Sequence, residues 1–336
     1  MRSFHYSRAT DTTEVVRAFA HPQNVPPTLA NTQFLAGGTT LLDLMKLDVM
    51  QPEAVLDLND LRQHFGGIGA DAKGLHLGAF AHMSEVADHP AVLRDYPVIA
   101  QSLQLAASAQ IRNMATLGGN VLQRTRCSYF RDPSWPQCNK RVPGSGCAAL
   151  GGINRKHAVL GTSPNCIATY AGDFAQALIA LDASVEVLSG SRLRNLRFAD
   201  LHTLPGDDPR RETVLLPSDL ITGFFVPAGA WTQRSLYLKI RDRQSFEFAL
   251  ASAAVALDLQ DGVMHEARVA LGGVATKPWR SPEAEAELKG QRLTEAVARH
   301  AAEAAFAGAV TYGENDFKPE LGRRTLVRAL MTAGAA

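Results

Sequence analysis

A glycine-rich turn between a strand-like and a helix-like segment is the feature that most constrains the fold of this 336-residue chain. The strand-like segment is TQFLAGG, and it is followed by the helix-like TTLLDLMKL and by a second strand-like run, AVLDLNDL. A strand, a Gly turn, a helix and a further strand are the parts of an α/β unit. We therefore expect a small α/β subdomain over roughly residues 30–60.

The rest of the chain mixes strand and helix patterns, which predicts an α+β (mixed α/β) fold. A Pro- and Asp-rich stretch followed by the strand-like LITGFFVP places a domain boundary near residue 228. We expect an N-terminal domain over 1–228, divided into 1–60 and 61–228, and a small C-terminal α+β domain over 229–336. The elements expected in the C-terminal domain are a strand at 234–241, a helix at 246–260, a strand within 265–280 that ends in a Gly turn, and two closing helices at 281–290 and 294–310.

All four cysteines lie in one segment, at about 124–166, that is rich in Arg, Lys, Pro and Gly. Ten, eight and eighteen residues separate successive cysteines, whereas zinc knuckles and ferredoxin-type clusters use shorter gaps. We interpret the four as metal or cluster ligands held by loops, because structural disulfides are rare in a reducing compartment. Four unrelated buried thiols and a zinc-stabilised scaffold remain the alternatives. The surrounding cations would stabilise a negatively charged [4Fe–4S] cluster; they are Arg124, Arg126, Arg131, Lys140 and Arg141.

Bulk properties exclude several classes of protein. The net charge is +1, so no overall field attracts nucleic acid or an anionic membrane surface. No apolar run reaches the length of about 18 residues that a membrane span needs. The N-terminal MRSFHYSRATDTTEVVRAF lacks the apolar core of a secretory signal, so we expect folding in the cytoplasm, no membrane insertion and no nucleic-acid partner.

Two glycine pairs are candidate phosphate sites. FLAGGTTLL and NMATLGGN each surround a Gly-Gly with hydroxyl or amide side chains, and glycine lets backbone amides approach a phosphate. A lone Gly-Gly is more typical of an ordinary tight turn, but two such sites in one domain could hold a long dinucleotide at two points. The nicotinamide and ATP fingerprints are absent, as are the HExxH and GxSxG motifs. We therefore expect a bound cofactor, rather than side chains, to carry the chemistry.

With these motifs in view, the sequence resembles the FAD-binding medium subunits of the xanthine dehydrogenase/molybdenum hydroxylase family. Within that family it is most similar to the FAD and [4Fe–4S] subunits of bacterial periplasmic aldehyde oxidoreductases. The likeness covers nearly the whole chain. It rests on LAGGTTLLDLMK, IRNMATLGGN, QRTRCSYF, CNKRVPGSGCAALGG, CIATYAGDFAQALIALDA, YLKIRDRQSFEFALASAAV and LGGVATKPWR. It implies a two-part FAD-binding region of the vanillyl-alcohol-oxidase-like type.

The resemblance also implies residue roles. Asp173 matches an acidic residue at the adenosine and ribose part of FAD, while Ile221 and Lys239 match residues against the isoalloxazine, where a cation would stabilise reduced flavin. The first Gly motif would wrap the pyrophosphate with Leu35, Ala36, Gly37, Gly38, Thr39, Thr40 and Leu41. The second would hold the other side of the cofactor with Thr116, Gly119 and Asn120. The cluster ligands would be Cys127, Cys138, Cys147 and Cys166, and no catalytic side chain is expected.

Three positions depart from the family pattern. Thr40 stands where Asn or Asp is common, and Tyr170 and Gly172 replace a more usual His and Ser before Asp173. These changes affect the expected contacts on the adenine side and leave the phosphate cradle in place.

The resemblance implies a heterotrimer. A large molybdopterin subunit would oxidise an aldehyde to a carboxylic acid, and a small [2Fe–2S] subunit would pass electrons to this chain's FAD. The external acceptor would be oxygen, a ferredoxin, a quinone, a dye or NAD. Because the chain has no signal of its own, we expect a periplasmic location through co-export with a partner, with the cytoplasm as the alternative.

Overall fold

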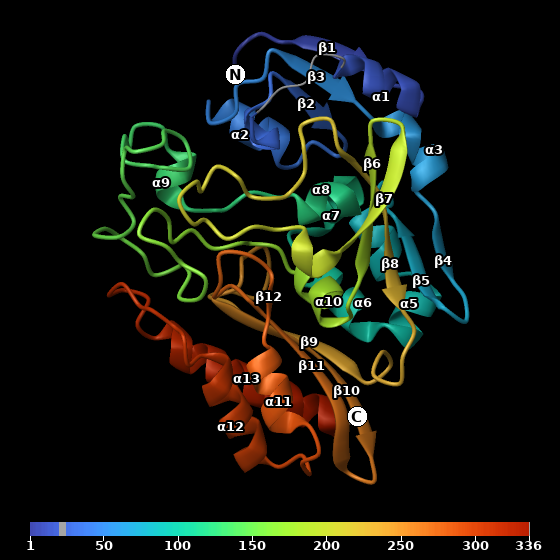
Figure 1. The fold of residues 1–336 in the computed structure, drawn as a ribbon, viewed down its shortest axis with the longest axis vertical. Coiled ribbons are helices and arrows are strands. Elements are labelled where there is room, and N and C mark those ends of the chain that lie inside the picture. The colour runs from blue at the N-terminus through green and yellow to red at the C-terminus, as the bar shows by residue number, and fades with distance from the viewer. Residues whose placement is uncertain (20–24, 336) are drawn as a thin grey trace.

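The structure is a computed structural model that describes residues 1–19 and 25–335. Residues 20–24 of the expected 1–60 subdomain and residue 336 of the expected C-terminal domain lie outside the described residues. Three β-sheets follow one another along the long axis of the molecule, from the N-terminal sheet at the top of Figure 1 to the C-terminal sheet near the bottom. The prediction of a mixed α/β chain is confirmed.

The first sheet is parallel and has the order β1-β3-β2. Its strand β2 runs into the Gly turn, where Gly38 adopts φ +71°, a left-handed conformation that glycine reaches without strain. The helix α2 follows and buries Leu41, Leu44 and Met45, which the helical spacing of three and four residues brings to one face. The expected strand–turn–helix–strand unit is therefore confirmed. The elements are β1 (His5–Arg8), α1 (Thr12–Ala18), β2 (Thr32–Leu35), α2 (Leu41–Lys46) and β3 (Ala54–Asp57), with the 3₁₀ turns Pro27–Leu29 and Asn59–Leu61 and the short α3 (Arg62–Phe65).

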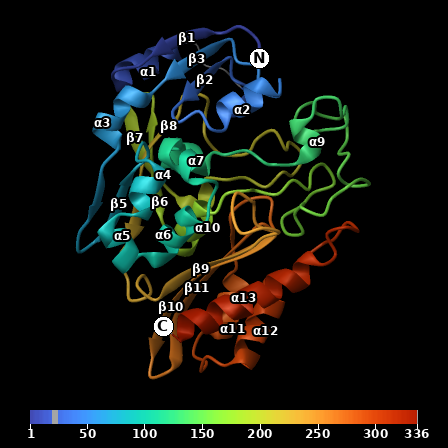
Figure 2. The same cartoon turned by 180° about the vertical axis from the view of Figure 1, so that it is seen from behind.

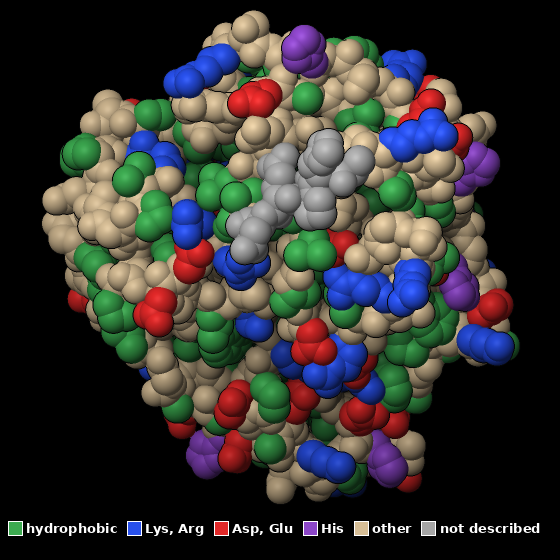
Figure 3. Space-filling model, turned by 45° about the horizontal axis from the view of Figure 1, so that its top comes forward, with side chains coloured by type: hydrophobic (Ala, Val, Ile, Leu, Met, Phe, Trp, Pro, Cys, Tyr) green, Lys and Arg blue, Asp and Glu red, His purple; other side chains and the backbone are tan. Residues whose placement is uncertain are grey.

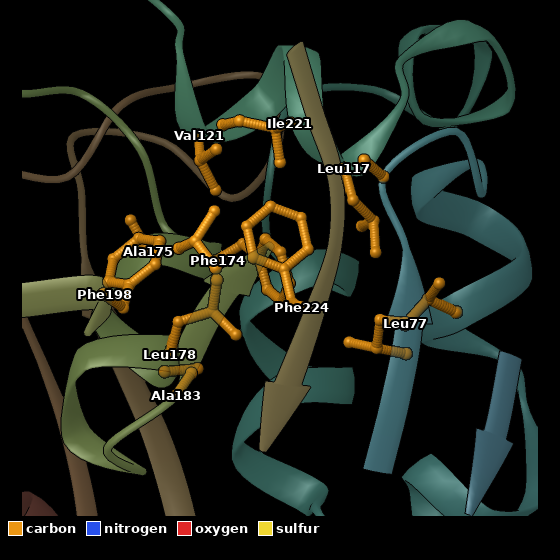
Figure 4. Close-up of a cluster of buried hydrophobic side chains, with 14 of the residues drawn as sticks. Leu77, Leu117, Val121, Phe174, Ala175, Leu178, Ala183, Phe198, Ile221 and Phe224 are labelled. Atoms are coloured by element: carbon orange, nitrogen blue, oxygen red, sulfur yellow. The ribbon is translucent and has the colours of Figure 1, made fainter. Parts of the chain in front are cut away.

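The second sheet is antiparallel and has the order β4-β5-β8-β6-β7. Pro90 and Pro97 stand at the starts of α5 and α6, which divides the helical stretch after β5 into short helices. Phe174 of α10, Phe224 of β8 and Leu77 of β5 belong to the main hydrophobic core (Figure 4). The elements are β4 (Ile68–Ala70), β5 (Gly74–Gly78), α4 (Met83–Ala87), α5 (Pro90–Asp95), α6 (Pro97–Gln104), α7 (Ala109–Met114), α8 (Leu117–Val121), α10 (Phe174–Ala180), β6 (Ser184–Ser189), β7 (Arg192–Arg197), the 3₁₀ turn Phe198–Asp200 and β8 (Leu220–Pro227).

The cysteine segment between α8 and α10 is almost entirely loop, with one short helix, α9 (Ser128–Arg131). Both views place it between the N-terminal sheet and the C-terminal helices (Figures 1 and 2). Arg131 pairs with Asp43 of α2 at 2.8 Å, and Asn154 donates to the Tyr312 carbonyl at 2.6 Å. The segment is thus fixed from both sides of the molecule.

The C-terminal sheet is antiparallel, in the order β12-β11-β10-β9. The helices α11, α12 and α13 lie together on one side of it (Figures 1 and 2). Its other face packs on α6 and α10, and Tyr237, Ala254 and Ala270 join the main core. The elements are β9 (Ser235–Ile240), β10 (Ala251–Gln260), β11 (Val263–Gly272), β12 (Trp279–Arg280), α11 (Pro282–Leu288), α12 (Glu295–Ala305) and α13 (Lys318–Gly334).

Two expectations for this part are wrong. The run 246–260 is not a helix, because residues 251–260 form the central strand β10. Residues 251–257 are buried on both faces, so the strand shows a continuous apolar run in place of alternation. The chain also does not close with two helices, because α13 follows them. Among the described residues, no helix is both long and apolar enough to cross a membrane.

Candidate functional site

A large cavity lies between the Gly turn after β2, the turn before α8 and the start of β8. Its empty volume is about 1320 Å³, which includes space open to solvent. On the face shown in Figure 3, acidic, basic and apolar side chains are interspersed, without a broad patch of one charge. The described lining is Pro27, Thr28, Thr32, Gln33, Phe34, Ala36–Leu41, Met50, Leu58, Ala79, Phe80, Ala115, Thr116, Gly118, Gly119, Leu122, Arg124, Arg210, Glu212, Thr213, Leu215–Pro217 and Asp219–Ile221.

The two glycine turns press against each other at one wall of this cavity. A Cβ atom on Gly37 would lie 2.0 Å from the Met114 carbonyl oxygen, so only glycine permits this approach. In the second turn, the Thr116 hydroxyl accepts a hydrogen bond from the Gly119 amide at 3.3 Å. Within the described part of the chain, the amides of residues 37–40 donate to no protein acceptor. Unpaired amides and threonine hydroxyls on a cavity wall are suited to phosphate oxygens.

Most of the residues that the sequence assigns to FAD meet in this cavity. They are Ala36, Gly37, Gly38, Thr39, Thr40, Leu41, Thr116, Gly119 and Ile221. Four others are not part of the lining, namely Leu35, Asn120, Asp173 and Lys239. Leu35 packs in the cluster around α2, and the Asn120 amide approaches the Met83 sulfur at 3.3 Å. FAD contacts by these residues remain predictions.

Asp173 and Lys239 form a buried ion pair. The Lys239 ammonium lies 2.7 Å from the Asp173 carboxylate and donates to the Leu105 carbonyl at 3.0 Å. The Tyr237 hydroxyl donates to the other Asp173 oxygen at 2.6 Å. Burial raises the pKa of Asp173, although the ammonium opposes that rise.

This ion pair bears on the roles expected for Asp173 and Lys239. The resemblance assigns Asp173 to the adenosine part of FAD and Lys239 to the isoalloxazine. In the structure these two side chains contact each other and neither lines the large cavity, so the division of their roles stays a prediction. The charge of Lys239 is also already neutralised by Asp173, which weakens the case for a free cation beside a flavin.

The four cysteines line one small cavity, of about 300 Å³ empty volume, together with His157, Tyr129 and Lys140. All four are free thiols. Burial raises the pKa of Cys127 to about 12 and also raises that of Cys166. Over residues 1–19 and 25–335, no three His, Cys, Asp or Glu side chains are arranged to hold a metal ion. The structure therefore brings the expected ligands to one place without showing a coordination site.

A charged triad lies between the two cavities, with Arg124 and Lys140 buried and Glu212 partly buried. Glu212 lies 3.1 Å from Arg124 and 2.8 Å from Lys140. Arg124 and Glu212 line the large cavity, whereas Lys140 lines the cysteine cavity. Burial alone would raise the pKa of Glu212, but the two cations lower it to about 2.

This triad changes the charge expected around the cysteines. Arg126 and Arg131 both pair with Asp43, so acidic groups compensate four of the five cations that the sequence places there. Sequence reasoning missed Glu212 because it lies 88 positions from Arg124, in the Pro- and Asp-rich stretch that served only to place the domain boundary. A local sequence pattern cannot predict an ion-pair partner at this distance along the chain.

Taken together, the cavity and its amide-lined wall define a site for a phosphate-bearing organic cofactor. Comparison with known families then supplies the identity of that cofactor. The chain belongs to the family of FAD-binding subunits of molybdenum hydroxylases, because the model described as "FAD binding domain in molybdopterin dehydrogenase" matches residues 2–229 and that described as "CO dehydrogenase flavoprotein C-terminal domain" matches 236–333. It is an oxidoreductase subunit, and the resemblance seen in the sequence is confirmed.

Similar proteins span nearly the full length of the chain. The "Aldehyde oxidoreductase FAD-binding subunit PaoB" of Escherichia coli K12 is 44% identical over 336 residues, which is 100% of this chain and 99% of that protein. The "Nicotine 6-hydroxylase medium subunit" of Paenarthrobacter nicotinovorans is 26% identical and covers 91% of this chain and 90% of its own length. The solved carbon monoxide dehydrogenase of Hydrogenophaga pseudoflava has a chain with TM-score 0.75 and 24% identity, covering 99% of this chain and 98% of that one. That structure supports the fold.

Proposed function

We propose that this chain is the electron-transfer subunit of an aldehyde-oxidising molybdenum enzyme. In the overall reaction an aldehyde and water give a carboxylic acid, two protons and two electrons, and the electrons leave through this chain. The 44% identity with the E. coli aldehyde oxidoreductase subunit over the full chain is the observation that carries the proposal. Bound FAD would accept electrons singly and release them singly or in pairs.

The chain's own residues would hold the cofactor without taking part in proton transfer. The amides of residues 37–40 and the Thr116 hydroxyl would bind the pyrophosphate, and Ile221 would pack against the ring system. Arg124 is the buried cation of the cavity wall, and Glu212 fixes its guanidinium. The large cavity suits a dinucleotide, whereas the cysteine cavity is too small for one.

The second part of the proposal is a [4Fe–4S] cluster on Cys127, Cys138, Cys147 and Cys166. Its support is the convergence of these four thiols on one small cavity, with the Lys140 cation at its wall. Ligation requires thiolates, and Lys140 opposes the burial that raises the pKa of Cys166. The irregular spacing favours a loop-held cluster over a zinc knuckle.

The remaining parts of the proposal concern the assembly. A large molybdopterin subunit and a small [2Fe–2S] subunit would complete a heterotrimer, and the electrons would pass from FAD to an external acceptor. The relatives named as medium chains or medium subunits support partners of this kind. We also propose a periplasmic location through co-export with a partner, for which immunoblotting of cell fractions is the test.

A visible spectrum with flavin and iron quantification tests both cofactors. We expect flavin bands and about four irons per chain in the wild-type protein. Cys138→Ser should lose the iron and keep the flavin, because its thiol lies in the cysteine cavity only. Ser134→Ala, an exposed position in the same loop, is the matched control and should keep both.

Other outcomes select the alternatives. A colourless chain with one zinc would replace the proposal by a zinc-stabilised scaffold. Flavin that is reduced by an aldehyde in the isolated chain would instead indicate a self-contained FAD oxidoreductase.

A further inference from the structure

A buried histidine touches one of the four cysteines. The Nε2 atom of His157 lies 3.1 Å from the Cys127 sulfur, and the side chain is 5% exposed. His157 comes from the loop after Cys147 and faces Tyr129 at 6.2 Å between ring centroids. For the other three cysteines, the described residues show no histidine contact of this kind. The contact therefore singles out one sulfur.

The C-terminal domain holds this histidine in place. The Lys318 ammonium, fully buried, donates to the His157 carbonyl at 2.9 Å and to the Gly273 carbonyl at 2.6 Å. Asn315 donates to the next carbonyl, that of Ala158, at 3.2 Å. Since both neighbouring carbonyls are bonded to the start of α13 and the turn before it, the backbone has little freedom to withdraw the imidazole from the sulfur.

We propose that His157 donates its Nε2 proton to the Cys127 sulfur and thereby raises the reduction potential of the [4Fe–4S] cluster. This inference rests on the cluster proposed above. A coordinated thiolate has no proton and can only accept a hydrogen bond, so the proton of the pair must reside on Nε2. One-electron reduction adds negative charge to the cluster, and a hydrogen bond to its sulfur stabilises that form. Lys318 acts through the backbone and is a positioning residue.

A redox titration monitored by electron paramagnetic resonance tests this role in the purified complex containing this chain. His157→Leu replaces the imidazole by an apolar side chain of similar size that has no hydrogen-bond donor. At a fixed solution potential, we expect the ratio of reduced to oxidised cluster to fall about tenfold, the effect of one hydrogen bond, which is about 59 mV for one electron. His157→Gln keeps an N–H donor and should recover most of the shift. His202→Gln changes a buried histidine that contacts the Val121 carbonyl and should leave the cluster potential unchanged.

The possible results distinguish a failure of the proposed cluster from a failure of the role given to His157. Wild-type protein without iron would overturn the cluster and this inference with it. A His157→Leu complex with full iron content and an unchanged potential would overturn only the role of His157. A further measurement needs no variant: the reduced wild-type cluster should show a coupled proton that exchanges in heavy water and belongs to an imidazole N–H. Lack of that proton would also contradict the inference.

Discussion

Replacing Glu212 by alanine is expected to lower the free energy of unfolding by about 3–5 kcal/mol, which is the cost of leaving buried charges without a partner. The side chains of Arg124 and Lys140 are only 4% and 10% exposed, and Glu212 is the acidic group that both contact. Denaturant unfolding of the purified chain measures the loss. Glu295→Ala removes a carboxylate from an exposed pair with Arg299 and serves as the control, with an expected loss of about 1 kcal/mol or less.

The same residue predicts a pH dependence. The pKa of Glu212 in the folded chain is about 2, below the ordinary 4.5, because the two cations outweigh the effect of burial. The folded state therefore binds fewer protons than the unfolded state between these values, and stability falls as the pH falls. The stabilisation is complete above about pH 4.5 and is lost towards pH 2. We expect the difference between wild type and Glu212→Gln to shrink across this window.

Two results would contradict this account of the triad. One is a Glu212→Ala chain with wild-type stability, which would show that the cations find other partners or water. The other is a wild-type-to-Glu212→Gln difference that stays constant down to pH 2. Because the triad lies between the two cavities, Glu212→Ala should also weaken flavin retention through Arg124.

The parts of the fold that local sequence determines are those that could be predicted. The Gly turn after β2 needs a left-handed residue at Gly38, and the apolar spacing of α2 is visible in eleven consecutive letters, AGGTTLLDLMK. In the C-terminal domain, Ser281 precedes α11 and its hydroxyl accepts from the Ala284 amide, as expected of a helix cap. Each of these signals acts within one or two turns of chain.

The errors arise where burial by distant segments decides the structure. Residues 251–257 lie between two layers and so show no alternation that would distinguish strand from helix. In α13, Gly322 interrupts the sequence pattern that would otherwise predict a helix. The glycine is needed because a Cβ there would lie 2.1 Å from the Phe306 ring of the neighbouring segment. The burial of β10 on both faces and the close contact at Gly322 both depend on distant segments, so they could be seen only in the structure.

Two of the departures from the family pattern, Tyr170 and Gly172, are structurally coupled. The Tyr170 hydroxyl is buried and donates to the Val121 carbonyl at 3.0 Å. A Cβ on Gly172 would lie 2.6 Å from that hydroxyl oxygen, so the tyrosine requires a glycine two positions later. The sequence lists these positions separately, and only the structure shows that they are coupled. The same limitation hid the contact between Asp173 and Lys239, which are 66 positions apart.

Gly37→Ala is expected to raise the dissociation constant for FAD about 100-fold, as measured by fluorescence titration of the flavin-free chain. The new methyl group would meet the Met114 carbonyl oxygen at 2.0 Å, and both partners are backbone, so one turn must move away from the other. That displacement separates the Gly turn from the segment that carries Thr116. Overpacking of this kind costs about 1–3 kcal/mol, and 3 kcal/mol lost from the bound state is about 100-fold in affinity.

Two further glycine variants test whether the effect is specific to the two glycine turns that line the large cavity. Gly118→Ala brings a Cβ to 3.2 Å from Ala79, a milder contact, and should weaken FAD binding by less than Gly37→Ala. Gly67→Ala has no atom within 4 Å of its new Cβ and lies outside the large cavity, so its affinity should equal that of wild type. If all three variants fold and bind FAD equally well, the two glycine turns do not hold the pyrophosphate. If affinity falls in the order of the contact distances, the close approach of the two turns is what shapes the site.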